Sequence, residues 1–85
     1  MTSASSPAPA LDQTLDLRGL KCPLPVLRTR KALRKLLPGD LLIVECTDPL
    51  AGIDIPHLLR ETGDQLEQQG TKENVLIFHI RRKLP

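Results

Sequence analysis

Alternation of apolar and polar positions predicts four β-strands in this chain. The first two cover residues 14–18, where leucines alternate with charged residues, and residues 40–47. Residues 64–69 carry a weaker strand pattern, and residues 75–82 carry a strong one. A turn is expected between these last two strands, over residues 70–74.

A helical repeat of apolar positions predicts a helix between the first two strands. It begins at Cys22 or Pro23, because proline is tolerated in a first helical turn, and it ends near Leu37, before Pro38-Gly39. One face of this helix is expected to be buried: Val26, Thr29, Leu33, Leu36 and Leu37. The opposite face is cationic: Arg28, Lys31, Arg34 and Lys35.

A second helix is expected over residues 53–62, with Asp54 as its N-cap and Gly63 as its stop. The order is then β-α-β-α-β-β, and a right-handed crossover makes the first two strands parallel. Both helices pack on one face of a four-stranded mixed sheet, which gives a two-layer α/β sandwich. The core face of the sheet would carry Leu15, Leu17, Leu42, Val44, Leu76, Phe78 and Ile80. The other face would carry Leu41, Ile43, Val75 and Ile77, either as an apolar patch for docking or as scattered exposed aliphatic residues.

Length and composition predict one small cytoplasmic domain. Of the 85 residues, the Ser/Ala/Pro-rich residues 1–12 are expected to be an unfolded tail, and residues 13–83 to form the domain. Two cysteines are too few for a disulfide framework, and the sequence shows no secretory signal and no apolar run long enough to span a membrane. A domain of this size encloses no large pocket, so we expect any reactive group to lie on the surface.

Charge is distributed unevenly although the net charge is only +2. Residues 21–35 hold six basic residues and no acid, whereas residues 36–85 hold eight acids and five bases. The cationic helix face is therefore either a solvated surface or a docking site for an acidic partner or a phosphate backbone. Phe78 is the sole aromatic residue, which disfavours recognition of RNA bases by stacking and makes direct nucleic-acid binding a minor alternative.

The candidate chemistry centres on Cys22, which lies between a predicted strand and a predicted helix N-terminus. An ordinary thiol with a pKa of ~8.5 is only ~3% ionised at neutral pH, and a helix end would lower that pKa by roughly 1–1.5. Lys21 adds a neighbouring cation, while Gly19, Pro23 and Pro25 shape the loop. We therefore expect an exposed, moderately acidic nucleophile with Leu24 and Leu27 beside it.

The other candidate residues carry weaker patterns. Cys46 alternates with inward-facing residues and is expected in the core, although parallel strands would also permit it to approach Cys22 as a resolving thiol. His57 and His79 have no cysteine or acid at metal-ligand spacing, so no metal site is predicted. A Cys-His hydrolytic pair has no supporting pattern either.

Residues 15–27, Leu-Asp-Leu-Arg-Gly-Leu-Lys-Cys-Pro-Leu-Pro-Val-Leu, resemble the N-terminal signature of the TusA/SirA family, with its Cys-Pro-x-Pro motif at Cys22, Pro23 and Pro25. Further matching segments follow along residues 14–83: Arg30-Lys31-Ala32-Leu33, Pro38-Gly39, Thr47-Asp48-Pro49, Asp54-Ile55-Pro56 and Phe78-His79-Ile80-Arg81. Members linked to tRNA thiolation often have glutamate between the prolines, where this chain has Leu24.

The resemblance implies a sulfurtransferase that needs no cofactor and carries sulfane sulfur as a persulfide on Cys22. It implies a cysteine desulfurase or rhodanese-like protein as donor and a DsrE-like or other thiol protein as acceptor, in tRNA thiolation or other sulfur trafficking. We expect Leu24, Leu27, Arg28, Lys31 and Lys35 to dock these partners. The alternatives are a regulatory module that binds RNA or a protein through the basic helix, and a redox switch that joins Cys22 to Cys46.

Overall fold

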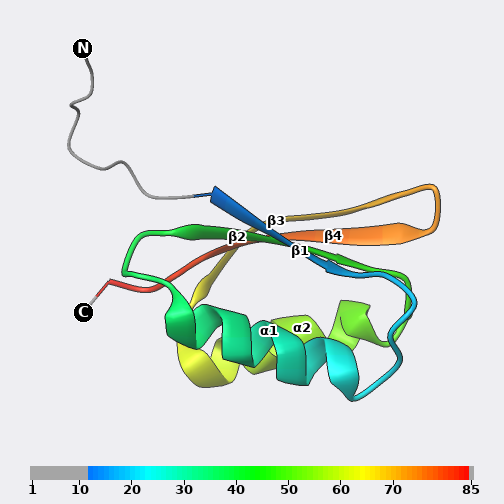
Figure 1. Ribbon diagram of the computed structural model, residues 1–85, viewed down its shortest axis with the longest axis horizontal. Helices are drawn as coiled ribbons and strands as arrows, with labels where there is room; N and C mark the ends of the chain where they lie inside the picture. Colours follow the sequence, from blue (N-terminus) through cyan, green and yellow to red (C-terminus); the bar gives the residue numbers. More distant parts are fainter. Residues whose placement is uncertain (1–11, 85) are drawn as a thin grey trace, which may run out of the picture.

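The computed structural model describes residues 12–84, which form one sheet covered on one face by two helices (Figure 1). The elements are β1 Asp12–Leu17, α1 Leu24–Lys35, β2 Leu41–Cys46, α2 Ala51–Thr62, β3 Gln65–Lys72 and β4 Val75–Arg81. The sheet has the strand order β1-β2-β4-β3, in which β1 and β2 are parallel and the other neighbours are antiparallel. The predicted two-layer β-α-β-α-β-β sandwich with a mixed sheet is confirmed.

The core lies between the sheet and the two helices. Its sheet side is formed by buried residues that alternate along the strands: Leu17, Leu42, Val44, Cys46, Phe78 and Ile80. Leu15 and Leu76, also predicted there, are half-buried and pack against the edge of this cluster. The helices contribute Leu33, Ile55 and Leu59, and Leu36 adds to them just after α1, so the period-2 and helical patterns of the sequence meet in one apolar layer.

The buried face of α1 differs from the prediction at its two ends. Leu37 is 68% exposed, because α1 ends at Lys35 and the extended backbone of Leu36 turns the next residue away from the core. Val26 is only half-buried, whereas Pro25 is buried in the first turn. The prolines of the loop therefore have different environments, since Pro23 is exposed and Pro25 anchors the start of the helix.

Strand β1 begins earlier and ends earlier than predicted. Arg18 lies outside it, because its backbone N–H and its guanidinium both donate to the Asp16 carboxylate at 2.9–3.1 Å and form a local turn. Asp12, assigned to the N-terminal tail by the sequence, is the first residue of β1. The rest of that predicted tail, residues 1–11, lies outside the described residues.

The turn between β3 and β4 is shorter than the predicted turn over residues 70–74. Glu73 and Asn74 have positive φ angles of 51° and 68° and form a tight two-residue connection that suits the twist of a hairpin. Gly70 remains inside β3, opposite Ile77, and β3 continues to Lys72. The prediction was wrong because it took Gly70 for a strand breaker.

The uncovered sheet face carries less apolar surface than predicted. Leu41 is buried, and the three other members of the expected patch, Ile43, Val75 and Ile77, are half-buried. Across the β2–β4 ladder each apolar residue on this face meets a polar one: Leu41 with Arg81, Ile43 with His79, and Ile77 with Glu45. This checkerboard divides the patch, so the face offers no continuous apolar surface.

Candidate functional site

The loops that follow β1 and β2 lie against each other, because these parallel strands end at the same edge of the sheet. Gly19, with a φ of 86° that favours glycine, donates its backbone N–H to Thr47 Oγ1 at 2.8 Å. The backbone N–H of Cys22 donates to Asp48 Oδ2 at 2.7 Å, and the other oxygen of that carboxylate accepts the Leu50 N–H at 3.0 Å. Asp48 therefore ties the Cys22 loop to the start of α2.

The thiol of Cys22 is exposed and donates a hydrogen bond to Asp54 Oδ2, with a sulfur–oxygen distance of 3.4 Å. This hydrogen bond raises the pKa of the Cys22 thiol above its ordinary value, and partial desolvation and the negative charges of Asp54 and Asp48 raise it further. The sequence-based expectation that the pKa of Cys22 is lowered is therefore wrong. The helix α1 begins only at Leu24, with Pro23 as N-cap, so Cys22 lies outside the helix, and two carboxylates lie near its sulfur.

Asp54 does not cap the second helix as the sequence suggested. The helix α2 begins at Ala51 with Leu50 as N-cap, so Asp54 lies within its first turns and presents its side chain to Cys22. Asp48 accepts the N–H of Leu50, the N-cap residue, and no side chain caps the first turn of α2. Sequence reasoning missed both acids as site residues, although each lies in a segment that carries the family resemblance and follows the strand parallel to the one before Cys22.

The residues around the motif keep their predicted exposure. Leu24 and Leu27 are 41% and 53% exposed, beside the sulfur-bearing loop, and Lys21 is exposed as well. The pKa of Asp48 is lowered by the hydrogen bonds from the Cys22 and Leu50 backbones and, more weakly, by the charge of Lys21. The Lys21 cation therefore acts on this neighbouring carboxylate, whereas the sequence assigned it to the thiolate.

Two small hollows flank the Cys22 loop. One of about 220 Å³ lies between α1 and α2 and is lined by Pro23, Val26, Asp54, His57, Leu58 and Glu61. The other, of about 260 Å³, is lined by Gly19, Leu20, Lys21, Thr47, Asp48 and Pro49. The first is lined by Asp54, whose carboxylate accepts the hydrogen bond from the Cys22 thiol.

Cys46 lies in the core and not at the surface. It is the last residue of β2, is 0% exposed, and pairs across the sheet with Leu17 and Leu76. Burial raises the pKa of its thiol to about 11. Both cysteines are free thiols, and the complete burial of Cys46 argues against the resolving role that the sequence left open.

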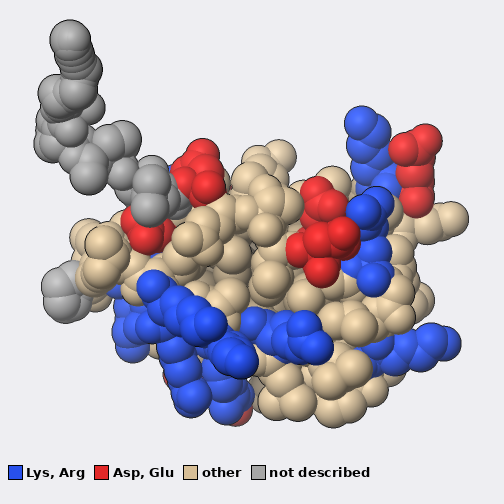
Figure 2. All heavy atoms as spheres, in the orientation of Figure 1, with Lys and Arg blue, Asp and Glu red and all other residues tan. Residues whose placement is uncertain are grey.

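The predicted docking cations lie along the exposed side of α1. Arg28, Lys31 and Lys35 are exposed and, with Gln13, Leu15 and Ala32, line a shallow cleft of about 520 Å³. Lys and Arg side chains gather over the lower left of the molecule, where α1 lies in Figure 1 (Figure 2). The expectation that this helix presents a cationic face is met.

Among residues 12–84, no group of three or more His, Cys, Asp and Glu side chains is arranged to hold a metal ion. His57 is exposed with its Nε2 3.5 Å from Glu61, and His79 lies half-buried in β4. No helix in the described part of the chain has the length and apolarity needed to cross a membrane.

Comparisons of the sequence with family models and with known proteins point to the same family. A family model described as sulfurtransferase TusA matches residues 13–82. A putative sulfur carrier protein of Neisseria meningitidis is 41% identical over 71 residues, which cover 84% of this chain and 96% of that protein. The sulfur carrier protein TusA of Pseudomonas aeruginosa is 38% identical over 74 residues, which cover 87% of this chain and 94% of that protein.

A solved structure agrees with the sequence relatives. The crystal structure of a SirA-like protein from Desulfitobacterium hafniense matches with a TM-score of 0.74 and 26% identity, and the match covers 85% of this chain and 99% of that one. Family model, relatives and fold together support a sulfur-carrier role and contacts with sulfur donors and acceptors. The chain therefore belongs to the TusA/SirA family of sulfur carrier proteins.

Proposed function

We propose that Cys22 carries sulfane sulfur as a persulfide, which makes the protein a cofactor-independent sulfurtransferase. One observation supports this most strongly: an exposed thiol is held on a loop whose backbone is fixed by Asp48 and whose sulfur contacts Asp54. A group held in one place at the surface reaches into a partner's site at low entropic cost. The buried Cys46 is unsuited to this task.

The transfer of sulfane sulfur between thiols involves no net oxidation or reduction, so it needs no external oxidant or reductant. Cys22 attacks the outer sulfur of a donor persulfide, the donor's sulfur–sulfur bond breaks, and the donor leaves as a thiolate. The proton of the Cys22 thiol moves along its hydrogen bond to Asp54 and from there to water or to the leaving thiolate. In the second half-reaction an acceptor thiolate attacks the outer sulfur, and Cys22 is the leaving group.

Because Asp54 and Asp48 raise the pKa of Cys22, they favour the protonated thiol in the resting carrier. A thiol in this state reacts slowly with adventitious electrophiles. A docked partner that places a cation near Asp54 and Asp48 would offset their charges and lower that pKa. Reactivity would thus be confined to the complex, where transfer is required.

The proposed donors are a cysteine desulfurase or a rhodanese-like protein, and the proposed acceptors are DsrE-like or other thiol proteins, in tRNA thiolation or another sulfur pathway. Docking would use the exposed apolar and cationic residues beside and along α1: Leu24, Leu27, Arg28, Lys31 and Lys35. Complementary charge on the partner would mainly raise the association rate, and this effect would weaken as salt increases.

Mass spectrometry of the intact chain tests the proposal after incubation with a cysteine desulfurase and cysteine. The wild type and a Cys46→Ala variant should each gain a sulfur atom that a thiol reductant removes. Cys22→Ser should gain none. A Cys22→Ser protein that loads sulfur as well as the wild type contradicts the proposal.

A further inference from the structure

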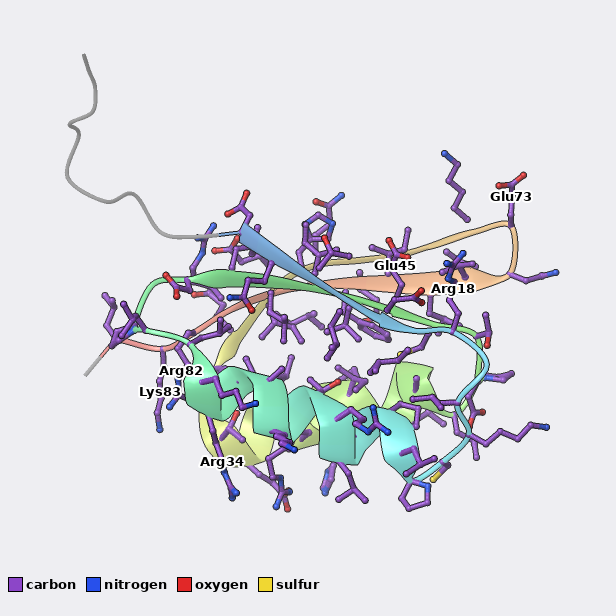
Figure 3. The ribbon with its side chains drawn as sticks, in the orientation of Figure 1. Arg18, Arg34, Glu45, Glu73, Arg82 and Lys83 are labelled. Atoms are coloured by element: carbon purple, nitrogen blue, oxygen red, sulfur yellow. The ribbon has the colours of Figure 1, made fainter. Side chains whose placement is uncertain are left out.

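A second cleft lies at the other end of α1 from Cys22. It has a volume of about 400 Å³ and is lined by Arg30, Leu33, Arg34, Glu61, Thr62, Asp64, Arg82 and Lys83. Figure 3 shows Arg34 extending from the end of α1 near Arg82 and Lys83, which follow β4. The cleft thus joins three segments that are distant in sequence, and it holds four cationic and two acidic side chains.

Asp64 organises this cleft from beneath. Its side chain is 0% exposed, and it accepts hydrogen bonds from Thr62 Oγ1 at 2.8 Å and from the Lys83 backbone at 2.8 Å. Nη1 of Arg82 donates to both of its oxygens, at 3.1 and 3.3 Å. The hydrogen bonds to this buried carboxylate hold Arg82 and the Lys83 backbone in place, and its charge is compensated by Arg82.

The remaining charges of the cleft do not balance. Glu61 is 3.7 Å from Arg30, which is longer than a hydrogen bond, and Nε of Arg30 is buried with no hydrogen-bond partner. The side chains of Arg34 and Lys83 are exposed and form no ion pair within residues 12–84. When Glu61 is assigned to Arg30 and Asp64 to Arg82, the described part of the chain offers no counter-charge to the other two cations.

From this arrangement we propose that the cleft binds the phosphate group of a small phosphate monoester. Such a group carries about two negative charges at neutral pH, which matches the two uncompensated cations, Arg34 and Lys83. Guanidinium groups bind phosphate oxygens in pairs through a planar fork of donors, and lysine adds a point charge. The volume falls in the range of roughly 300–1,000 Å³ typical of small-molecule sites, so the ligand carries more than the bare anion, and Leu33 offers it an apolar wall.

Titration of the full ¹⁵N-labelled chain with inorganic phosphate and with adenosine monophosphate, at constant ionic strength, tests the site. Amide signals of residues 62–64 and 82–83 should shift and saturate. The double variant Arg34→Gln/Lys83→Gln should bind at least about tenfold more weakly, because it loses two charge-assisted contacts. The matched variant Arg60→Gln/Lys72→Gln removes two exposed cations that lie outside both the cleft and the docking surface on α1, and it should change affinity less than about twofold.

Three outcomes of this titration overturn the proposal: shifts that do not saturate, shifts spread evenly along α1, or equal weakening by the two double variants. A short single-stranded RNA is the comparison ligand. The contrary result is that RNA binds more tightly than the monoester, with steep salt dependence, and that both double variants weaken its binding equally. In that case the cations make diffuse contacts with the phosphate backbone of RNA, and the cleft is not a binding site. Melting curves of each variant, with Lys83→Gln alone as a milder change, show that lost binding is not lost folding.

Discussion

The two cysteines end up in opposite environments although both belong to the same edge of the sheet. Cys22 follows β1 in an exposed loop, whereas Cys46 closes β2 and is 0% exposed. Both thiols have raised pKa values, but the causes differ. Asp54 acts mainly through a hydrogen bond to Cys22, and burial acts on Cys46.

This difference separates a controllable thiol from an inert one. A partner can reverse the effect of Asp54 on Cys22 by supplying a cation, because the carboxylate and the sulfur are both near the surface. Nothing short of opening the core exposes Cys46 to water or to a reagent. The two thiols are the same residue type and both have a raised pKa. They differ in solvent accessibility and in the cause of the pKa shift.

The largest expected contrast is in alkylation of the native protein. Iodoacetamide should modify Cys22 at least about a thousandfold faster than Cys46, since the buried thiol reacts only after opening that approaches global unfolding. Mass spectrometry of peptides from time points checks this, and both cysteines should react in denaturant. Comparable native rates would remove the distinction between the two sites.

A smaller effect is expected from Asp54→Asn. Loss of the carboxylate should lower the pKa of Cys22 and raise its alkylation rate several-fold at neutral pH, so the rate–pH profile moves to lower pH. Glu61→Gln is the matched control, because it removes the same charge from α2 and does not contact the sulfur. Superimposable profiles for Asp54→Asn and wild type would show that the carboxylate does not govern the thiol.

Stability should respond to Cys46 and not to Cys22. Cys46→Ser places a hydroxyl in an apolar core and should destabilise the protein by about 1–3 kcal/mol. Cys22→Ser lies at the surface and should leave the urea midpoint unchanged. Sulfur loading should show the reverse pattern, with Cys46→Ser still loaded at Cys22. A destabilised Cys22→Ser would place that residue in the structural framework.

The smallest effect concerns the carboxylate that fixes the Cys22 loop. Hydrogen bonds from the Cys22 and Leu50 backbones lower the pKa of Asp48, so its contribution to stability is present above the ordinary value of 3.8 and is lost as the pH falls through its folded-state value. Asp48→Asn removes this component. Melting temperatures of variant and wild type should therefore converge as the pH falls below 3.8; a constant difference would contradict the assignment.

The fold was predictable because its determinants are local and periodic. Alternation identified β2 and its inward-facing Cys46, and the Pro38-Gly39 and Gly63 stops placed the ends of both helices within a few residues. The polar hairpin was less predictable, since Gly70 in β3 has the same local features as a turn residue. Exposure of Cys22 followed from its turn-forming neighbours.

The sequence by itself determined the strand and helix order, the inward or outward face of most residues, and the position of the Cys-Pro-x-Pro loop at the end of a strand. Only the tertiary structure decided the chemistry of the thiol, because Asp48 and Asp54 are 26 and 32 residues away from Cys22 in the chain. Periodicity fixes which side of an element a residue occupies. Electrostatic effects depend on distances between elements, which are set only when parallel strands bring two loops to one edge.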